Sequence, residues 1–148
     1  GDTITILEDR GLFDTLAWIV NPDVGAIIIE GARYDFPSND FLSTIQNIAE
    51  EKNILIILDE ITSGWRITDG GVYKVNNFES DIVVYGKGLG NGYAISAVVG
   101  KKDIMDSVKK TFISSTFWSE RTGFAAALKT IEIMEKNKTW RKELSPGI

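Results

Sequence analysis

The chain has 148 residues and a formal net charge of −5, a length that fits one domain with a real hydrophobic core. The acidic balance argues against a nucleic-acid partner, and the absence of cysteine excludes disulfides and thiolate catalysis. Histidine is also absent, which removes Ser-His-Asp triads and the usual zinc sites and leaves acid–base work to Lys, Asp, Glu, Tyr or a cofactor. No apolar run could span a bilayer and the first residues do not resemble a signal peptide, so we expect a soluble, cytoplasmic protein with no membrane partner.

Short apolar, β-branched runs alternate with amphipathic stretches along the chain. Continuous apolar runs are typical of strands that are covered on both faces. The predicted strands of this kind are residues 25–30, 55–59 and 82–85. Residues 39–52 carry apolar side chains on one helical face, with Ser38 or Asn39 as the N-cap. The resulting β-α-β order predicts an α/β fold with three α/β/α layers and a mostly parallel sheet.

Weaker patterns predict the remaining elements. Residues 95–99 follow a short connection after the third strand, so this strand should run antiparallel to its predecessor. The other predicted elements are strands at 3–7 and 112–117 and helices at 11–20, 101–110 and 122–136. The last helix should bury one apolar stripe. Its members are Phe124, Ala127, Leu128, Ile131 and Met134.

Residues 80–92, SDIVVYGKGLGNG, place one lysine, Lys87, among four glycines directly after a buried strand. Asp59 ends the preceding strand in the same way. Because ligands of open α/β sheets lie beyond the carboxyl ends of the strands, we expect Asp59 and Lys87 to meet there. Partial desolvation would lower the pKa of Lys87 and make it an amine nucleophile. A lysine that joins the aldehyde and an acid that faces the ring nitrogen would suit pyridoxal phosphate.

On this hypothesis Asp59 keeps the pyridine nitrogen protonated. Lys87 holds the aldehyde as an internal aldimine and, once released, moves the proton between the substrate α-carbon and the cofactor C4′. The alternative is that Asp59 caps a turn and Lys87 is solvated. The glycines fit neither the dinucleotide fingerprint nor a Walker loop, which needs Ser or Thr where Gly88 stands. Asp59 and Glu60 are not a catalytic pair, because adjacent strand residues point to opposite faces.

Four stretches resemble class III (subgroup II) pyridoxal-phosphate aminotransferases. LDEITSGWR at 58–66 resembles the family's D-E-V-x-x-G-x-x-R stretch, and residues 86–106 resemble its lysine segment. Residues 114–135 resemble the following threonine segment and helix, and IIIEG at 27–31 resembles the strand before them. The resemblance is strongest to the glutamate-1-semialdehyde aminomutase-like branch.

The resemblance implies roles for five residues. Lys87 matches the Schiff-base lysine, and Asp59 matches the partner of the pyridine nitrogen. Ile61 stands where the family usually has a valine on the ring face, and Thr62 stands where many members have a glutamine near the ring hydroxyl. Thr116 matches the threonine that binds the cofactor phosphate of the neighbouring subunit in a homodimer.

The implied activity is transfer of an amino group between a primary amine or amino acid and an oxo-acid or aldehyde. Family members are far longer, so residues 1–148 should be part of the pyridoxal-phosphate-binding large domain, without the N-terminal segment and the C-terminal small domain. Two alternatives stay open, namely an intramolecular aminomutase and a non-catalytic fragment or pseudo-enzyme that acts as a folding or binding module. Uncovered sheet edges and apolar surface predict low stability or self-association.

Overall fold

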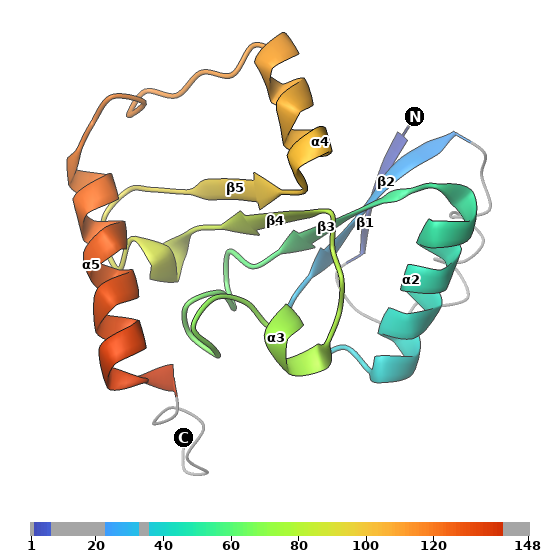
Figure 1. Cartoon of the computed structure of the whole chain (residues 1–148), viewed down its shortest axis with the longest axis horizontal. Coiled ribbons are helices and arrows are strands. Elements are labelled where there is room, and N and C mark those ends of the chain that lie inside the picture. Colours follow the sequence, from blue (N-terminus) through green and yellow to red (C-terminus); the bar gives the residue numbers. More distant parts are fainter. Residues whose placement is uncertain (1, 7–22, 33–35, 141–148) are drawn as a thin grey trace.

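The computed structural model describes residues 2–6, 23–32 and 36–140, and a five-stranded sheet lies at its centre (Figure 1). The spatial order of the strands, β1-β2-β3-β4-β5, is also their order in the chain. Their bounds are β1 Asp2–Ile6, β2 Val24–Glu30, β3 Leu55–Asp59, β4 Ile82–Tyr85 and β5 Ala97–Gly100. Strands β1 to β4 are parallel and β5 is antiparallel to β4. The predicted α/β class, with a mostly parallel sheet and one antiparallel strand, is confirmed.

Helix α2 (Asn39–Lys52) joins β2 to β3 and has the bounds that the sequence predicts. The Ser38 hydroxyl oxygen accepts a hydrogen bond from the Phe41 N–H at 3.2 Å, which satisfies one unpaired donor of the first turn. The helix ends at Asn53, which takes the left-handed conformation with a φ of 54°. Local capping therefore sets both ends of α2.

The main hydrophobic core lies between α2 and one face of the sheet. Ile27 pairs with Ile56 and Ile29 with Leu58 across β2 and β3, and all four are buried on the same face. The buried α2 side chains that complete this core are Phe41, Leu42, Ile45 and Ala49. Each fully buried aliphatic side chain of this size contributes about 1.5–3 kcal/mol, so this core is the main source of stability in the described part.

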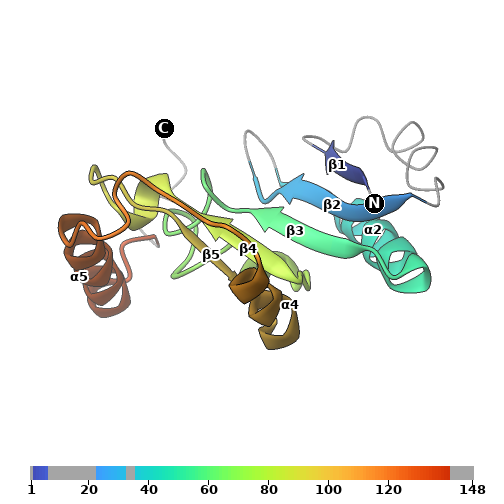
Figure 2. The ribbon, with the colours of Figure 1, turned by 90° about the horizontal axis from the view of Figure 1, so that it is seen from above.

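The other helical segments are short, except the last. Their bounds are α3 Tyr73–Asn76, η2 Lys87–Leu89, α4 Lys102–Asp106, η3 Ser107–Lys110 and α5 Thr122–Asn137. Helices α2 and α4 lie on the same side of the sheet, and α5 stands at the end of the molecule farthest from α2 (Figures 1 and 2). The helix predicted at 101–110 is present as α4 followed by η3, whereas the helix predicted at 11–20 lies outside the described residues. None of the described helices is long and apolar enough to cross a membrane.

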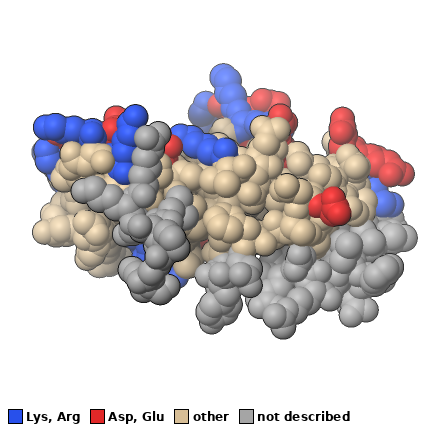
Figure 3. All heavy atoms as spheres, turned by 90° about the horizontal axis from the view of Figure 1, so that it is seen from below, with Lys and Arg blue, Asp and Glu red and all other residues tan. Residues whose placement is uncertain are grey.

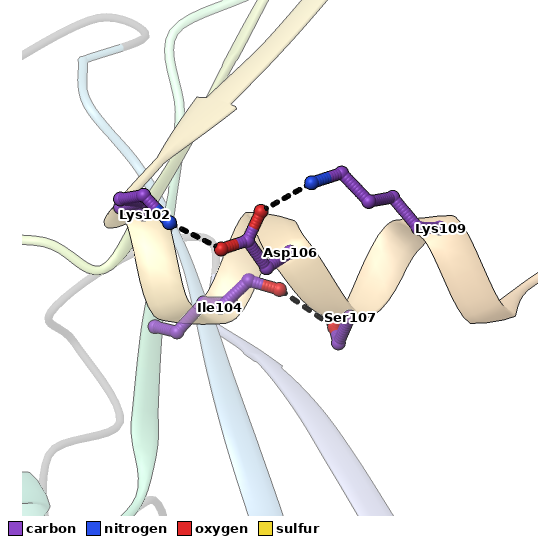
Figure 4. Close-up of polar contacts among 5 residues, drawn as sticks. All are labelled: Lys102, Ile104, Asp106, Ser107 and Lys109. Atoms are coloured by element: carbon purple, nitrogen blue, oxygen red, sulfur yellow. Dashed lines mark hydrogen bonds and ion pairs between the residues drawn. The ribbon is translucent and has the colours of Figure 1, made fainter.

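Asp106 ties α4 to η3 (Figure 4). Its carboxylate accepts hydrogen bonds from the Lys102 ammonium at 2.5 Å and from the Lys109 ammonium at 2.8 Å. Both bonds lower the pKa of Asp106, and the bond from Lys102 contributes more than the bond from Lys109. The Ser107 hydroxyl donates to the Ile104 carbonyl oxygen in the same turn. Because exposed ion pairs contribute little, these contacts fix the local path of the chain rather than the fold.

The strand predicted at 112–117 is wrong. Residues 111–121 are irregular apart from a turn at 116–119, and they arch from η3 to α5 beyond the β5 edge of the sheet (Figure 1). Phe112 is 94% exposed, so its side chain gains no burial from this path. The apolar pattern suited a strand, but a strand also needs a neighbouring edge with which to pair, and no described strand pairs with this segment.

Helix α5 is present as predicted, but its apolar stripe is only partly buried. Ala127 and Met134 are buried and Ile131 packs against Tyr85 and Leu89 in a small second core. Phe124 and Leu128 are 56% and 69% exposed, which contradicts the prediction that both face inward. Periodicity identifies an apolar helix face, but it does not say whether the same chain supplies the surface that covers it.

The charged side chains are distributed unevenly on the face shown in Figure 3. Lys, Arg, Asp and Glu lie mostly along one margin of this face, and most of the remaining described surface carries no charge (Figure 3). Large apolar side chains that are exposed in the described part include Tyr93, Val98 and Trp118. Exposed apolar side chains that gather into a large patch mark interaction sites.

Candidate active site

Lys87 stands at the point where the chain leaves β4. Gly86 is extended, with φ −166° and ψ −150°, and Lys87 follows in the left-handed region with a φ of 36°. A non-glycine residue in this region costs on the order of 1 kcal/mol, and such residues cluster at functional sites. The turn therefore holds Lys87 in a specific, locally unfavourable conformation at the carboxyl end of the sheet.

The glycine after Lys87 allows a close approach of two loops. A Cβ atom at Gly88 would lie 2.9 Å from the Gly64 carbonyl oxygen and 3.4 Å from the Arg66 Cγ. Real Cβ atoms rarely tolerate such contacts, so a side chain here would push the 61–72 loop away from Lys87. The glycines that flank the lysine thus serve loop packing, and no phosphate-binding motif is needed to explain them.

Asp59 lies beside Lys87 on the neighbouring strand. Its backbone is in register with Val84 of β4, three residues before Lys87. The Asp59 Oδ1 atom accepts a hydrogen bond from the Ile61 N–H at 2.9 Å, which fixes the direction of the carboxylate. The side chain is half-buried. Asp59 thus caps a turn, as the alternative interpretation of the sequence expects. The same hydrogen bond holds its carboxylate at the carboxyl edge of the sheet.

Thr62 and Ile61 complete the group. The Lys87 Nζ atom donates a hydrogen bond to the Thr62 Oγ1 atom at 2.9 Å. The Ile61 side chain lies next to Gly86, where a Cβ atom would come within 3.4 Å of the Ile61 Cγ2. Four of the five predicted site residues are therefore brought together at the carboxyl ends of β3 and β4.

Thr116 is not part of this group. It is exposed, in a turn of the 111–121 segment, which lies apart from the η2 loop in Figure 1. No described hydrogen bond joins it to Lys87. The sequence assigned this threonine to the site of a neighbouring subunit, and that assignment stays a prediction.

The expected desolvation of Lys87 is not found, since Lys87 is exposed. An open cleft of about 880 Å³ begins at Lys87 and extends toward α5. Its walls include Trp65, Arg66, Lys129 and Trp140, so aromatic and cationic side chains surround the approach to the lysine. The lysine therefore opens onto this cleft, and a buried strand end alone does not shield an amine from water.

Glu60 is the residue that sequence reasoning missed. Its side chain is 0% exposed, whereas the preceding Asp59 is half-buried, as expected for neighbours that point to opposite faces. Burial raises the pKa of Glu60, and hydrogen bonds from Ser63 and from the backbone of Tyr73 and Val72 oppose this shift. The available sequence signal was a second acidic residue directly after the apolar strand that ends in Asp59.

The family model of the class-III aminotransferases matches residues 10–145. The chain belongs to the class-III aminotransferase family. A curated relative, the 3-aminobutyryl-CoA aminotransferase of Cloacimonas acidaminovorans (strain Evry), is 38% identical over 126 residues, which cover 84% of this chain and 30% of the relative. The glutamate-1-semialdehyde 2,1-aminomutase of Nitrosopumilus maritimus (strain SCM1) is 36% identical over 131 residues, which cover 82% of this chain and 31% of that enzyme.

A solved structure shares the fold of this class-III aminotransferase chain. It is the ornithine aminotransferase of Toxoplasma gondii, described with partial occupancy of PLP at its active site. The TM-score is 0.74 at 27% identity, and the match covers 84% of this chain and 30% of that structure. The chain thus spans about a third of the length of the proteins it matches, and the predicted family is confirmed.

Proposed function

We propose that the chain supplies part of the active site of a pyridoxal-phosphate-dependent aminotransferase. The parent enzyme would transfer an amino group between a primary amine or amino acid and an oxo-acid or aldehyde. The observation that carries this proposal is the pairing at the carboxyl edge: the Lys87 amine lies 2.9 Å from Thr62 Oγ1, beside the strand that ends in the anchored Asp59 carboxylate. An amine and an acid on neighbouring strand ends are the two groups that this cofactor needs from a protein.

The site residues fit the cofactor chemically. Pyridoxal phosphate, when bound, supplies an aldehyde that reacts with amines and a ring that withdraws electrons from the substrate α-carbon. Asp59 would hold a proton at the ring nitrogen. Lys87 would bind the aldehyde carbon and later move a proton at the substrate α-carbon. Ile61 would cover a ring face and exclude water from it, and Thr62 would orient the Lys87 amine.

An intramolecular aminomutase is the second candidate. The aminomutase relative at 36% identity favours it, and the site residues described above serve both reactions equally. A third possibility, a non-catalytic module, is disfavoured because Asp59, Thr62 and Lys87 are present and meet at one edge. A comparison of products from the parent enzyme would separate transfer between two molecules from transfer within one.

We further infer that the 148 residues form part of the large domain of a homodimer. Phe124 and Leu128 are exposed on α5, and Thr116 lies on an exposed segment apart from its own Lys87. Both features suit a second copy that covers α5 and receives Thr116 near its cofactor phosphate. The cytoplasmic location expected from the sequence stays a prediction.

Reductive trapping tests the proposed role of Lys87. The chain is mixed with pyridoxal phosphate, reduced with borohydride, and digested for mass spectrometry. We expect the label to concentrate on Lys87 and to disappear from this position in Lys87→Ala, while Lys52→Ala, a change at an exposed lysine on α2, leaves the labelling of Lys87 intact. Equal labelling of many surface lysines in the unaltered chain would contradict specific binding by these residues.

Asp59→Asn separates binding from chemistry. The amide keeps an oxygen that can accept the Ile61 N–H but cannot hold a proton at the ring nitrogen as a carboxylate does. We therefore expect labelling of Lys87 to persist in the chain and turnover of the full-length parent to fall by about 10²-fold or more. Undiminished turnover would remove Asp59 from the proposed role.

A further inference from the structure

Glu60 is a buried carboxyl group with no part in the proposed chemistry. It follows β3 directly, and its backbone N–H donates to the Val84 carbonyl oxygen at 2.9 Å. Its Oε2 atom accepts a hydrogen bond from the Ser63 hydroxyl at 2.5 Å, and its Oε1 atom accepts one from the Tyr73 N–H at 3.4 Å. No Lys or Arg of the described residues forms an ion pair with it. Hydrogen bonds alone therefore compensate for the burial of this group.

Two glycines pack directly against the Glu60 carboxyl. A Cβ atom at Gly31, just after β2, would lie 3.0 Å from Glu60 Cδ and 2.9 Å from the Ser63 hydroxyl oxygen. A Cβ atom at Gly71, just before α3, would lie 2.6 Å from Glu60 Oε1. Gly31 also donates its N–H to the Asp59 carbonyl oxygen at 2.9 Å. The carboxyl thus occupies the point where the end of β2, the end of β3 and the start of α3 converge.

The 61–72 loop that Glu60 anchors carries half of the candidate site. Ile61 lies next to Gly86, and Thr62 accepts the hydrogen bond from Lys87. The loop returns to the Glu60 carboxyl at Ser63 and again at Tyr73. Loss of the carboxyl would release the loop at both Ser63 and Tyr73. Thr62 lies between Glu60 and Ser63, so it would lose the nearer of these two anchors.

We propose that Glu60 is a positioning residue whose carboxyl joins residues 31, 63 and 71–73 and thereby holds Ile61 and Thr62 against Gly86 and Lys87. The consequence for Lys87 rests on the proposed function, whereas the consequence for the loop does not. Glutamine has nearly the same shape, and its amide can accept the Tyr73 N–H and donate to the Ser63 hydroxyl. The proposal therefore expects Glu60→Gln to preserve the loop and Glu60→Ala to release it.

Hydrogen–deuterium exchange of the cofactor-free chain tests the loop. We expect peptides within 61–72 to exchange about tenfold faster in Glu60→Ala, because loss of the carboxyl removes two buried hydrogen bonds that oppose local opening of the loop. Peptides of α2 should be unchanged, Glu60→Gln should resemble the parent chain, and Glu51→Ala, at an exposed site on α2, is the matched control. Unchanged exchange at 61–72 in Glu60→Ala would overturn the proposal.

If Glu60→Ala does not fold, Ser63→Ala tests the same proposal. It leaves the carboxyl in place and removes only the hydrogen bond from Ser63, so exchange at 61–72 should rise by a smaller factor, about threefold. Exchange equal to that of the parent chain would overturn the proposal in this case.

Labelling by pyridoxal phosphate tests the consequence for Lys87. The ratio of label at Lys87 to label at Lys52 should fall in Glu60→Ala and in Thr62→Val. It should be retained in Glu60→Gln, which keeps the shape of the side chain and can bond to both Ser63 and Tyr73. A retained ratio in Glu60→Ala would overturn the link to Lys87. If the parent chain itself shows no preference for Lys87, the proposed function fails, and the exchange result still decides whether Glu60 holds the loop.

Discussion

The two ends of the sheet differ in how well the described chain buries their apolar side chains. Around β2, β3 and α2, Ile27 and Ile45 are 0% exposed, and the helix covers the sheet face with a closed apolar core. Around α5 and the 111–121 segment, Phe112, Trp118 and Leu128 are 94%, 65% and 69% exposed. The first region is stable through its own contacts, and the second presents surface for which the described chain has no cover. The candidate site lies on the boundary, since Asp59 ends a strand of the first region and Lys87 begins the loop toward the second.

The largest expected effect is the loss of stability when a side chain of the closed core is shortened. Ile45→Ala should lower the free energy of unfolding by about 2–5 kcal/mol, because it leaves a cavity among well-packed neighbours. Leu128→Ala, the matched change on exposed α5, should lower it by less than about 0.5 kcal/mol. Urea unfolding followed by circular dichroism measures both values. Equal losses would mean that the two regions are equally complete.

Self-association should depend on the exposed region and not on the core. We expect the chain to form concentration-dependent oligomers and Leu128→Asp to raise the dissociation constant at least about tenfold, because burial of one leucine is worth about 1.5–3 kcal/mol. Sedimentation velocity measures this change. Asn47→Asp adds the same charge at an exposed position of α2 and should leave association unchanged. A parent chain that stays monomeric at all concentrations would refute the interpretation of α5 as an interface.

The pH dependence of stability should report Glu60, which lies in the more complete region. Its folded-state pKa is raised above the ordinary value of 4.5, so the folded state binds this proton more tightly than the unfolded state does. The stabilisation is fully present below pH 4.5 and is lost as the pH rises through the raised pKa. As the pH rises, the unfolding free energy of the unaltered chain should therefore fall relative to that of Glu60→Gln.

This difference isolates Glu60 from its titratable neighbours. Asp59, Tyr73 and Tyr85 are the other groups electrostatically coupled around it, and they are identical in both proteins. Burial, followed by the contact with Tyr73, raises the pKa of Tyr85 further above neutrality, so it does not titrate in the same range. Parallel profiles for the parent and Glu60→Gln between pH 4 and pH 8 would show that Glu60 does not carry the dependence.

The smallest effect should come from Asp106. Its lowered pKa means that it contributes stability above the ordinary value of 3.8 and loses it as the pH falls toward the lowered value. Because Lys102 and Lys109 are exposed, solvent and salt screen both ion pairs. We expect the urea midpoint of Asp106→Asn to match that of the parent at neutral pH. A clear drop would show that the α4–η3 junction supports the fold.

The sequence by itself determined the strands and helix that build the carboxyl edge. The strands at 55–59 and 82–85 and the helix at 39–52 have the predicted bounds, because continuous β-branched runs and a serine cap act locally. Placement of Asp59 and Lys87 at that edge followed from strand direction alone. The family resemblance only placed Thr62 where many members have a glutamine near the cofactor ring, and the hydrogen bond that it accepts from Lys87 came from the structure.

Only the tertiary structure decided which surfaces are covered and which buried polar groups are satisfied. The network of Glu60 depends on Gly31, Ser63 and Tyr73, which come from the end of β2, the 61–72 loop and the start of α3, and no local sequence pattern connects these three segments. The exposure of Lys87 and Leu128 and the absence of a strand at 112–117 share another cause. Local periodicity shows which side chains of a segment could be buried, but burial also requires a second surface that packs against them. Within the described residues, the sheet provides that surface for α2, whereas no surface covers Phe124 and Leu128 of α5.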